Sequence, residues 1–462
     1  MAPIVAVLLV VAVGFPLALV LTRKPLLAAL IAPLIAALTT TAATIIMLLV
    51  GGPLLLWTVA LLLGQYALIP VLRKRVIEPL PYGSRADVLW LVGPLLPPLL
   101  LVLDLPMKWD AHSIWWLHAA YFTKGSDVAQ AAIVNPPYAF SHTDYPPLPS
   151  APVAAVWAVF PGYDFHVAQF VSALVTFSSI AMLAYAVRRA TGEAPVAVSR
   201  LAGVGVGLAS WSVSGQNVAG GYSDALWAAA FVAGAVLLLF VANGLSRPAL
   251  PLLLLTVAGL SKNEGFVMVV VLAAVATFKE RRNLRVAWQV WLPVAAGLSW
   301  SVIARFLGAQ SDLLAGGQFR QLLAGDPVML DRFPQILIAM ARVSGAAVAL
   351  ALGVALLGAL FLRPTRRELG IGSDLWLWAV NVAYAASLVL TYLVTPYDLS
   401  WHLGSSVDRV SLPLILMACV SAACWGVSTV RRRVETSVSA VDASHAAHHL
   451  ASAKAGGAFH QS

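Results

Sequence analysis

The feature that most constrains this chain is a succession of apolar runs, most of them long enough to cross a lipid bilayer. A hydrocarbon layer of ~30 Å takes roughly 20 helical residues. Runs near this length lie at 2–22, 26–50, 53–72, 88–106, 164–187, 199–215, 223–242, 286–306, 335–362, 373–394 and 411–430. Two shorter runs, 248–261 and 265–278, bring the expected number of transmembrane helices to about thirteen.

The composition agrees with this interpretation. Hydrophobic residues make up 60% of the 462 residues and charged residues 11%, and the mean hydropathy is +0.86. These values exceed what a soluble core requires, so we expect an all-α polytopic membrane protein with the lipid bilayer as its surroundings. The net charge of +9 lies in short clusters at the ends of apolar runs, so it indicates orientation and no nucleic-acid partner is expected.

The basic clusters fall in every second loop between the apolar runs. They are Arg23-Lys24, Arg73 to Arg75 with Arg85, Arg188-Arg189 with Arg200, Arg247, Lys279 to Arg285, Arg363 to Arg367, and Arg431 to Arg433. The positive-inside rule makes these loops cytoplasmic. The N-terminus is then outside and the C-terminus inside. We expect a multi-pass protein of a plasma (inner) membrane.

The apolar run 146–160 is short and contains Pro149 and Pro152. If it crossed the membrane, every later basic loop would face outward, so we expect a re-entrant or interfacial helix on the outer side. We therefore expect one transmembrane domain over 1–430, with an extracytoplasmic catalytic loop at 107–163. The polar segment 431–462, rich in Ala, Ser and His, is expected to be a disordered cytoplasmic tail.

The first outer loop begins with the stretch Lys108-Trp109-Asp110-Ala111-His112. Asp110 precedes a helical pattern over 111–123, where aspartate is favoured as an N-cap. The same position leaves a carboxylate open to the aqueous side as a candidate general base. Trp109 is interpreted as a membrane-interface residue, with sugar stacking as the alternative. Further along the loop, His142, Asp144 and Tyr145 precede a Pro-Pro pair that favours extended backbone.

Two short apolar runs meet at Lys262 and Glu264. About thirteen helical residues rise only ~20 Å, against a hydrocarbon layer of ~30 Å, so the turn should stop below the outer surface. Ionisable groups at membrane depth mark a functional site by default. Lys262 is therefore a candidate for the phosphate of an outer-leaflet lipid, with Glu264 supporting it. The alternative is a Lys262–Glu264 pair that extends outward to water.

The last outer loop, 397–409, is dense in side chains that bind phosphate or sugar. Arg409 adjoins the final apolar run, which would place its guanidinium at phosphate level. His402 is a further candidate there. The alternative for Arg409 is an ion pair with Asp408 or Asp398.

Several of these features together resemble the GT-C superfamily of membrane glycosyltransferases. Within it the likeness is to polyprenyl-phosphate-sugar-dependent enzymes of the protein O-mannosyltransferase and aminoarabinose transferase type. It covers roughly 88–280 and the last outer loop, and rests on Asp110 in the first outer loop, Tyr-Pro-Pro-Leu at 145–148, Asp224 opening a span, Gly-Leu-Ser-Lys-Asn-Glu-Gly at 259–265, and the late Arg409.

The resemblance implies an inverting sugar transfer from a polyprenyl-monophosphate donor to a hydroxyl of a glycan, glycolipid or protein acceptor. Asp110 would be the base, with Lys262, Arg409 and His402 on the donor phosphate. Asp144, His142, Tyr145, Glu264, Asp224 and Trp109 would bind substrate or support the site. No cofactor is expected, and a divalent metal is not expected either, because Ala111 stands where many relatives carry a second acidic residue.

Two other classes of function remain open from the sequence. A transporter or a flippase for lipid-linked sugars would line its path with buried Lys262, Glu264 and Arg305, and a binding or assembly partner would need no activity. The polar residues collect in the outer loops rather than near the middle of the spans, which favours the transferase. The preponderance of Ala, Val and Arg is typical of a GC-rich bacterial genome, which favours a role in cell-envelope assembly.

Overall fold

The computed structural model describes residues 2–75, 85–99, 107–241, 248–310, 318–362 and 371–431. Within these ranges all regular structure is helical. Eight helices there are long and apolar enough to cross a membrane: Ala2–Thr22, Pro25–Val50, Leu54–Leu72, Phe165–Ala190, Val196–Ala219, Arg332–Leu360, Gly372–Leu393 and Leu399–Arg431. The chain is therefore an all-α, multi-pass membrane protein, as its apolar runs predict.

The three N-terminal helices follow the predicted runs closely. They are α1 (Ala2–Thr22), α2 (Pro25–Val50) and α3 (Leu54–Arg75). The helices α1 and α2 pack backbone against backbone, since a Cβ atom at Gly14 would lie 1.9 Å from the Ala32 carbonyl oxygen. This contact requires glycine, because small residues allow membrane helices to approach closely.

The run 88–106 was expected to form one span, and the described part of it does not. The helix α4 (Arg85–Val92) is followed by the 3₁₀ turn η1 (Gly93–Leu95), and 100–106 lie outside the described residues. Proline at 94, 97 and 98 removes backbone donors and interrupts the α-helix. Asp87 lies at the start of α4, and its Oδ1 atom is 2.8 Å from Arg200 Nη2 and 3.8 Å from Arg188 Nε. These ion pairs join α4 to the ends of the two long helices that carry Arg188 and Arg200.

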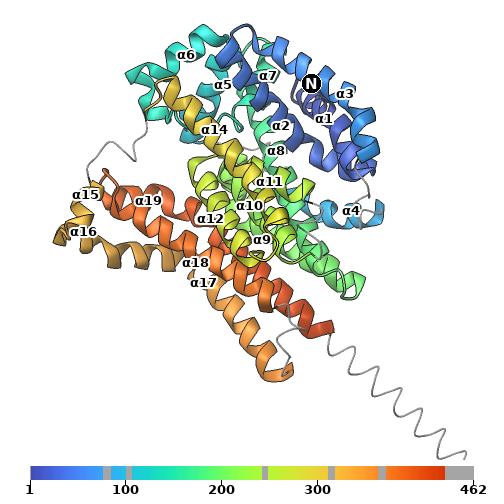
Figure 1. Ribbon diagram of the computed structural model, residues 1–462, viewed down its shortest axis with the longest axis vertical. Coiled ribbons are helices and arrows are strands. Elements are labelled where there is room, and N and C mark those ends of the chain that lie inside the picture. The colour runs from blue at the N-terminus through green and yellow to red at the C-terminus, as the bar shows by residue number, and fades with distance from the viewer. Residues whose placement is uncertain are drawn as a thin grey trace, which may run out of the picture.

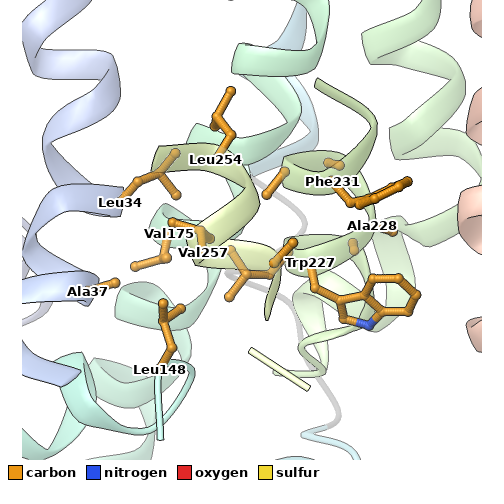
Figure 2. Close-up of a cluster of buried hydrophobic side chains, with 14 of the residues drawn as sticks. Leu34, Ala37, Leu148, Val175, Trp227, Ala228, Phe231, Leu254 and Val257 are labelled. Atoms are coloured by element: carbon orange, nitrogen blue, oxygen red, sulfur yellow. The ribbon is translucent and has the colours of Figure 1, made fainter. Parts of the chain in front are cut away.

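The centre of the molecule is built from α8 (Phe165–Ala190), α9 (Val196–Ala219), α10 (Asp224–Leu239), α11 (Ala249–Gly259) and α12 (Asn263–Lys279). Every residue of α10 is buried, which suits a helix that is apolar on all sides. Figure 2 shows its core contacts, where side chains of α2, α8, α10 and α11 meet Leu148 of the segment 107–163, the predicted first outer loop. The predicted catalytic loop therefore rests directly on the core of the bundle.

The C-terminal helices, labelled α17, α18 and α19, lie together and away from the N-terminal helices α1, α2 and α3 (Figure 1).

The run 286–306 was expected to form one helix, but it is divided into α13 (Leu284–Ala287), η5 (Trp288–Trp291) and α14 (Leu292–Phe306). The remaining elements are α15 (Gln318–Leu323), α16 (Pro327–Leu330), α17 (Arg332–Leu362), α18 (Ile371–Leu393), α19 (Leu399–Val410) and a helix over 412–431. The basic positions Arg247 and Arg363 to Arg367, and the predicted tail from 432 onward, lie outside the described residues.

The predicted first outer loop folds into short helices only. These are a π-helical turn η3 (Ala111–Trp115), α5 (Trp116–Thr123), α6 (Ser126–Val134), η4 (Pro136–Ser141) and α7 (Ala151–Val159). Helix α7 has 9 residues and rises only about 14 Å, too little to cross a bilayer. This length agrees with the predicted interfacial or re-entrant helix.

Inside this loop, His118 of α5 fixes the position of η4. Its Nε2 lies 2.9 Å from the Ser141 carbonyl oxygen and 3.2 Å from the Ser141 hydroxyl. Burial lowers the pKa of His118 to about 3. The imidazole is therefore neutral in the folded protein at physiological pH.

Acid should weaken the fold through this residue. The unfolded chain binds a proton near pH 6.5 and the folded chain does not, so the stabilisation is complete above pH 6.5 and declines as the pH falls toward 3, by about 1.4 kcal/mol per pH unit. Between pH 7.5 and pH 5 the apparent melting temperature of the parent should fall more than that of His118→Gln. The exposed His166 provides the control: His166→Gln should behave as the parent. Equal acid sensitivity of the parent and His118→Gln would contradict this account.

Candidate active site

Five charged side chains that are far apart in the sequence form one continuous row. Arg409 Nη1 donates a hydrogen bond to Asp110 Oδ2 and lies 3.6 Å from Asp224 Oδ2. Lys262 Nζ lies 2.9 Å from Asp224 Oδ1 and 3.3 Å from Glu264 Oε1. The charges therefore alternate from Asp110 to Glu264, and Asp224 joins the two cations.

Helix ends bring these residues together at one end of the bundle. Asp224 is the first residue of α10, and Lys262 and Glu264 lie at the start of α12. Arg409 is in the last turn of α19. Carboxylates at helix starts and cations in last turns are favoured by the helix dipole. The row therefore lies where the starts of α10 and α12 meet the last turn of α19.

Burial differs along the row. The side chains of Asp224 and Lys262 are 3% and 7% exposed, while those of Asp110 and Glu264 are 18% and 25% exposed. Buried charges persist when they are paired, and each of the two innermost groups contacts two opposite charges. The row therefore has a fixed buried centre and two accessible carboxylates at its ends. Among the described residues, Glu264 Oε2 has no hydrogen-bond partner.

Asp110 is not the helix N-cap that its position suggests. Its backbone is already helical, with φ −60° and ψ −29°, and its side chain makes no capping hydrogen bond. The π-helical turn that follows widens the backbone at this point, and such turns are frequent at functional sites. The carboxylate instead accepts a hydrogen bond from Arg409. A local sequence pattern cannot reveal a partner that is so distant in the sequence.

The turn between α9 and α10 contributes residues that the sequence analysis missed. Gly221 has φ +84°, and a Cβ atom there would lie 2.7 Å from the Trp116 ring and 2.8 Å from the Ala111 Cβ atom. Only glycine satisfies both the left-handed backbone and this close approach. The neighbouring Tyr222 places its ring 4.6 Å from the Arg409 guanidinium carbon. Burial, and then the negative charge of Asp110, raise the pKa of Tyr222, so it is a neutral phenol.

The first outer loop meets the α11–α12 turn through Asp144 and Tyr145. Asn263 Nδ2 donates to Asp144 Oδ2 at 2.9 Å, and Trp300 Nε1 donates to the Asp144 carbonyl oxygen at 2.9 Å. The Tyr145 ring stacks on His142 with ring centroids 4.7 Å apart, and its centroid lies 5.8 Å from Lys262 Nζ. These contacts hold the predicted loop residues beside the charged row.

Other predicted residues make no hydrogen bond or ion pair with the charged row in the part of the chain described. His402 Nδ1 is 2.8 Å from Thr395 Oγ1, although the charges of Glu264, Lys262 and Arg409 act on its imidazole. The Trp109 side chain is exposed. Arg305, which the transporter hypothesis requires to be buried, is exposed on α14.

The alternative contacts predicted for Lys262 and Arg409 have different outcomes. Lys262 does contact Glu264, but Asp224 is its nearer partner and the lysine is buried rather than extended to water. Asp398 accepts a hydrogen bond from the Trp401 backbone N–H and caps α19. Arg409 pairs with Asp110 and Asp224, so the alternative of an ion pair with Asp408 or Asp398 is wrong.

In the described ranges, His, Cys, Asp and Glu side chains form no group suited to a metal ion. No protein-family model, curated protein or solved structure matches the chain. Its chemistry therefore has to be inferred from the charged row itself. That row offers an accessible carboxylate able to accept a proton and two fixed cations able to bind an anion.

Proposed function

We propose that the chain is an integral-membrane glycosyltransferase of the GT-C type, which moves a sugar from a polyprenyl-monophosphate donor to an acceptor hydroxyl. One observation carries this proposal. Asp110, the candidate base, and Arg409, a candidate phosphate ligand, are 299 residues apart in the sequence and in direct contact. Lys262, the second candidate phosphate ligand, is joined to them through Asp224.

The proposed reaction uses these groups as follows. The acceptor hydroxyl attacks the anomeric carbon, its proton passes to Asp110, and the bond from that carbon to the phosphate oxygen breaks with inversion. The leaving polyprenyl phosphate takes the electron pair and gains negative charge. Fixed cations at Arg409 and Lys262 stabilise that developing charge more than they stabilise the ground state.

Donor binding would change the partner of Arg409. A phosphate oxygen that enters between them replaces the carboxylate as the partner of the guanidinium, which binds either group through its fork of N–H donors. Asp110 is then released beside the sugar as a free base. Asp224 keeps contact with both cations and preserves their spacing.

The lengths of the helices support a site at the level of lipid head groups. Helix α11 has 11 residues and rises about 17 Å, while α2 and α8 have 26 residues and rise about 39 Å. The turn that follows α11 is thus recessed relative to the ends of the long spans. Arg188 and Arg200 lie at the ends of α8 and α9 that are remote from the charged row, which supports an extracytoplasmic site under the positive-inside rule.

The proposal is tested with purified protein in detergent. Given a polyprenyl-phosphate sugar and a mixture of envelope glycans, glycolipids and peptides as acceptors, it should release polyprenyl monophosphate without any membrane gradient. A transporter or flippase would leave the donor intact. Release of polyprenyl monophosphate is measured directly by mass spectrometry, and its absence with every donor and acceptor tested would contradict the proposal.

A further inference from the structure

Lys108 is a cation near the charged row that has no role in the reaction proposed above. It lies two residues before Asp110 and is half-buried. Its Nζ donates a hydrogen bond to Asn217 Oδ1 at 2.8 Å and lies 5.6 Å from the centroid of the Tyr222 ring. The same ring faces Arg409, so Tyr222 is shared by the two cations.

The charge balance of the site gives Lys108 a particular importance. Arg409 and Lys262 each contact two carboxylates, which offset most of their attraction for an incoming anion. The three carboxylates outnumber the two cations of the row. Lys108, in contrast, has the neutral Asn217 as its hydrogen-bond partner, and no carboxylate of the described residues lies within ion-pair distance. Its charge is therefore available to attract an anion.

The lysine is also held in place before any ligand arrives. Its backbone N–H donates to the Gly220 carbonyl oxygen at 3.2 Å. Its stem packs so closely on the same residue that a Cβ atom at Gly220 would lie 2.7 Å from Lys108 Cγ. Since an ammonium group carries three N–H donors and Asn217 takes one, donors remain for a phosphate oxygen. A fixed cation loses little conformational freedom on binding.

We propose that Lys108 is a third ligand of the lipid phosphate and the cation that first attracts it to the site. This inference rests on the proposed function and adds a residue to it. The phosphate meets Lys108 beside Tyr222, and then replaces Asp110 as the partner of Arg409. Arg409 and Lys262 stabilise the leaving group, while Lys108 determines how tightly an anionic lipid binds.

The test measures binding of undecaprenyl monophosphate to the purified protein in nanodiscs of neutral lipid. Lys108→Gln should weaken binding about tenfold to a hundredfold, as expected for a lost hydrogen bond between charged groups. Lys108→Arg, which keeps the charge, should restore most of the affinity. Lys124→Gln is the matched control, because Lys124 is an outer-loop lysine over an aromatic ring, 5.3 Å from the Tyr163 centroid, outside the charged row.

The outcomes separate this inference from the proposed function. If the parent binds undecaprenyl monophosphate and Lys108→Gln, with an unchanged melting temperature, binds it equally well, Lys108 is not a phosphate ligand although the function stands. Equal losses in Lys108→Gln and Lys124→Gln would show a general surface-charge effect and also overturn the inference. If the parent does not bind the lipid phosphate, the proposed function itself fails.

Discussion

Asp110→Asn should abolish sugar transfer while the protein still binds its donor. The amide keeps the size of the carboxylate and accepts a hydrogen bond from Arg409, but it cannot take the acceptor proton. A positioned general base contributes about 10²–10⁴-fold to the rate, so turnover should fall by that factor. Donor affinity should be equal to or higher than that of the parent, because the phosphate no longer competes with a charged Asp110 for the guanidinium.

The matched control is Asp127→Asn in the same outer loop. Asp127 lies at the start of α6, where its carboxylate accepts a hydrogen bond from the Ser126 hydroxyl, and it does not contact the charged row. Its substitution should leave turnover within about twofold of the parent, since surface changes away from a site have small effects. Turnover of Asp110→Asn at the parent rate would exclude Asp110 as the base.

Asp224→Asn should be the most destabilising single change in the site. Asp224 is almost fully buried and contacts both Lys262 and Arg409. Removing one partner of a buried ion pair leaves an uncompensated charge and typically costs about 3–5 kcal/mol. We expect a lower apparent melting temperature in detergent, together with loss of activity, because the two cations are no longer held apart at a fixed spacing.

A second substitution distinguishes this charge effect from a packing defect. Lys262→Met removes the stranded ammonium, so the double variant Asp224→Asn/Lys262→Met should be more stable than Asp224→Asn alone. Ser223→Ala, at the neighbouring buried position, is the control for packing and should change the melting temperature little. If Asp224→Asn has the same melting temperature as the parent, the ion pairs of Asp224 contribute nothing to the stability of the fold.

Much of the helical architecture could be predicted from the sequence, because the thickness of a bilayer fixes the length of an apolar helix. The runs 2–22, 26–50 and 164–187 differ from the observed helices by only a few residues at either end. The prediction of one span over 88–106 failed because average hydropathy does not register the three prolines that break its helix. The run 286–306 likewise gave no sign of the 3₁₀ turn that divides it.

The members of the charged row could be singled out from the sequence, but their contacts could not. Asp110, Lys262 and Arg409 stood out because ionisable groups are rare in this chain and each adjoins an apolar run. Their pairing through Asp224 depends on how four helix ends pack, which no local pattern contains. The same limit explains the wrong N-cap assignment of Asp110, since its actual partner is 299 residues away.

Tyr222 and Lys108 were missed although a signal was present. Gly220, Gly221 and Tyr222 lie in the turn that precedes Ser223 and Asp224, and paired glycines mark close approach of backbone to another group. Here that group is the start of the first outer loop, at Lys108 and Ala111. A Gly-Gly-aromatic turn beside a buried carboxylate is therefore a feature to weigh in sequences of this kind.

The most direct test of the account is an experimental density map of the protein with undecaprenyl monophosphate bound. We expect the phosphate to lie between Arg409 and Lys262, with Lys108 within hydrogen-bond distance and Asp110 separated from the guanidinium. Phosphate density remote from these residues, or an Asp110–Arg409 pair that stays intact with the lipid bound, would contradict it.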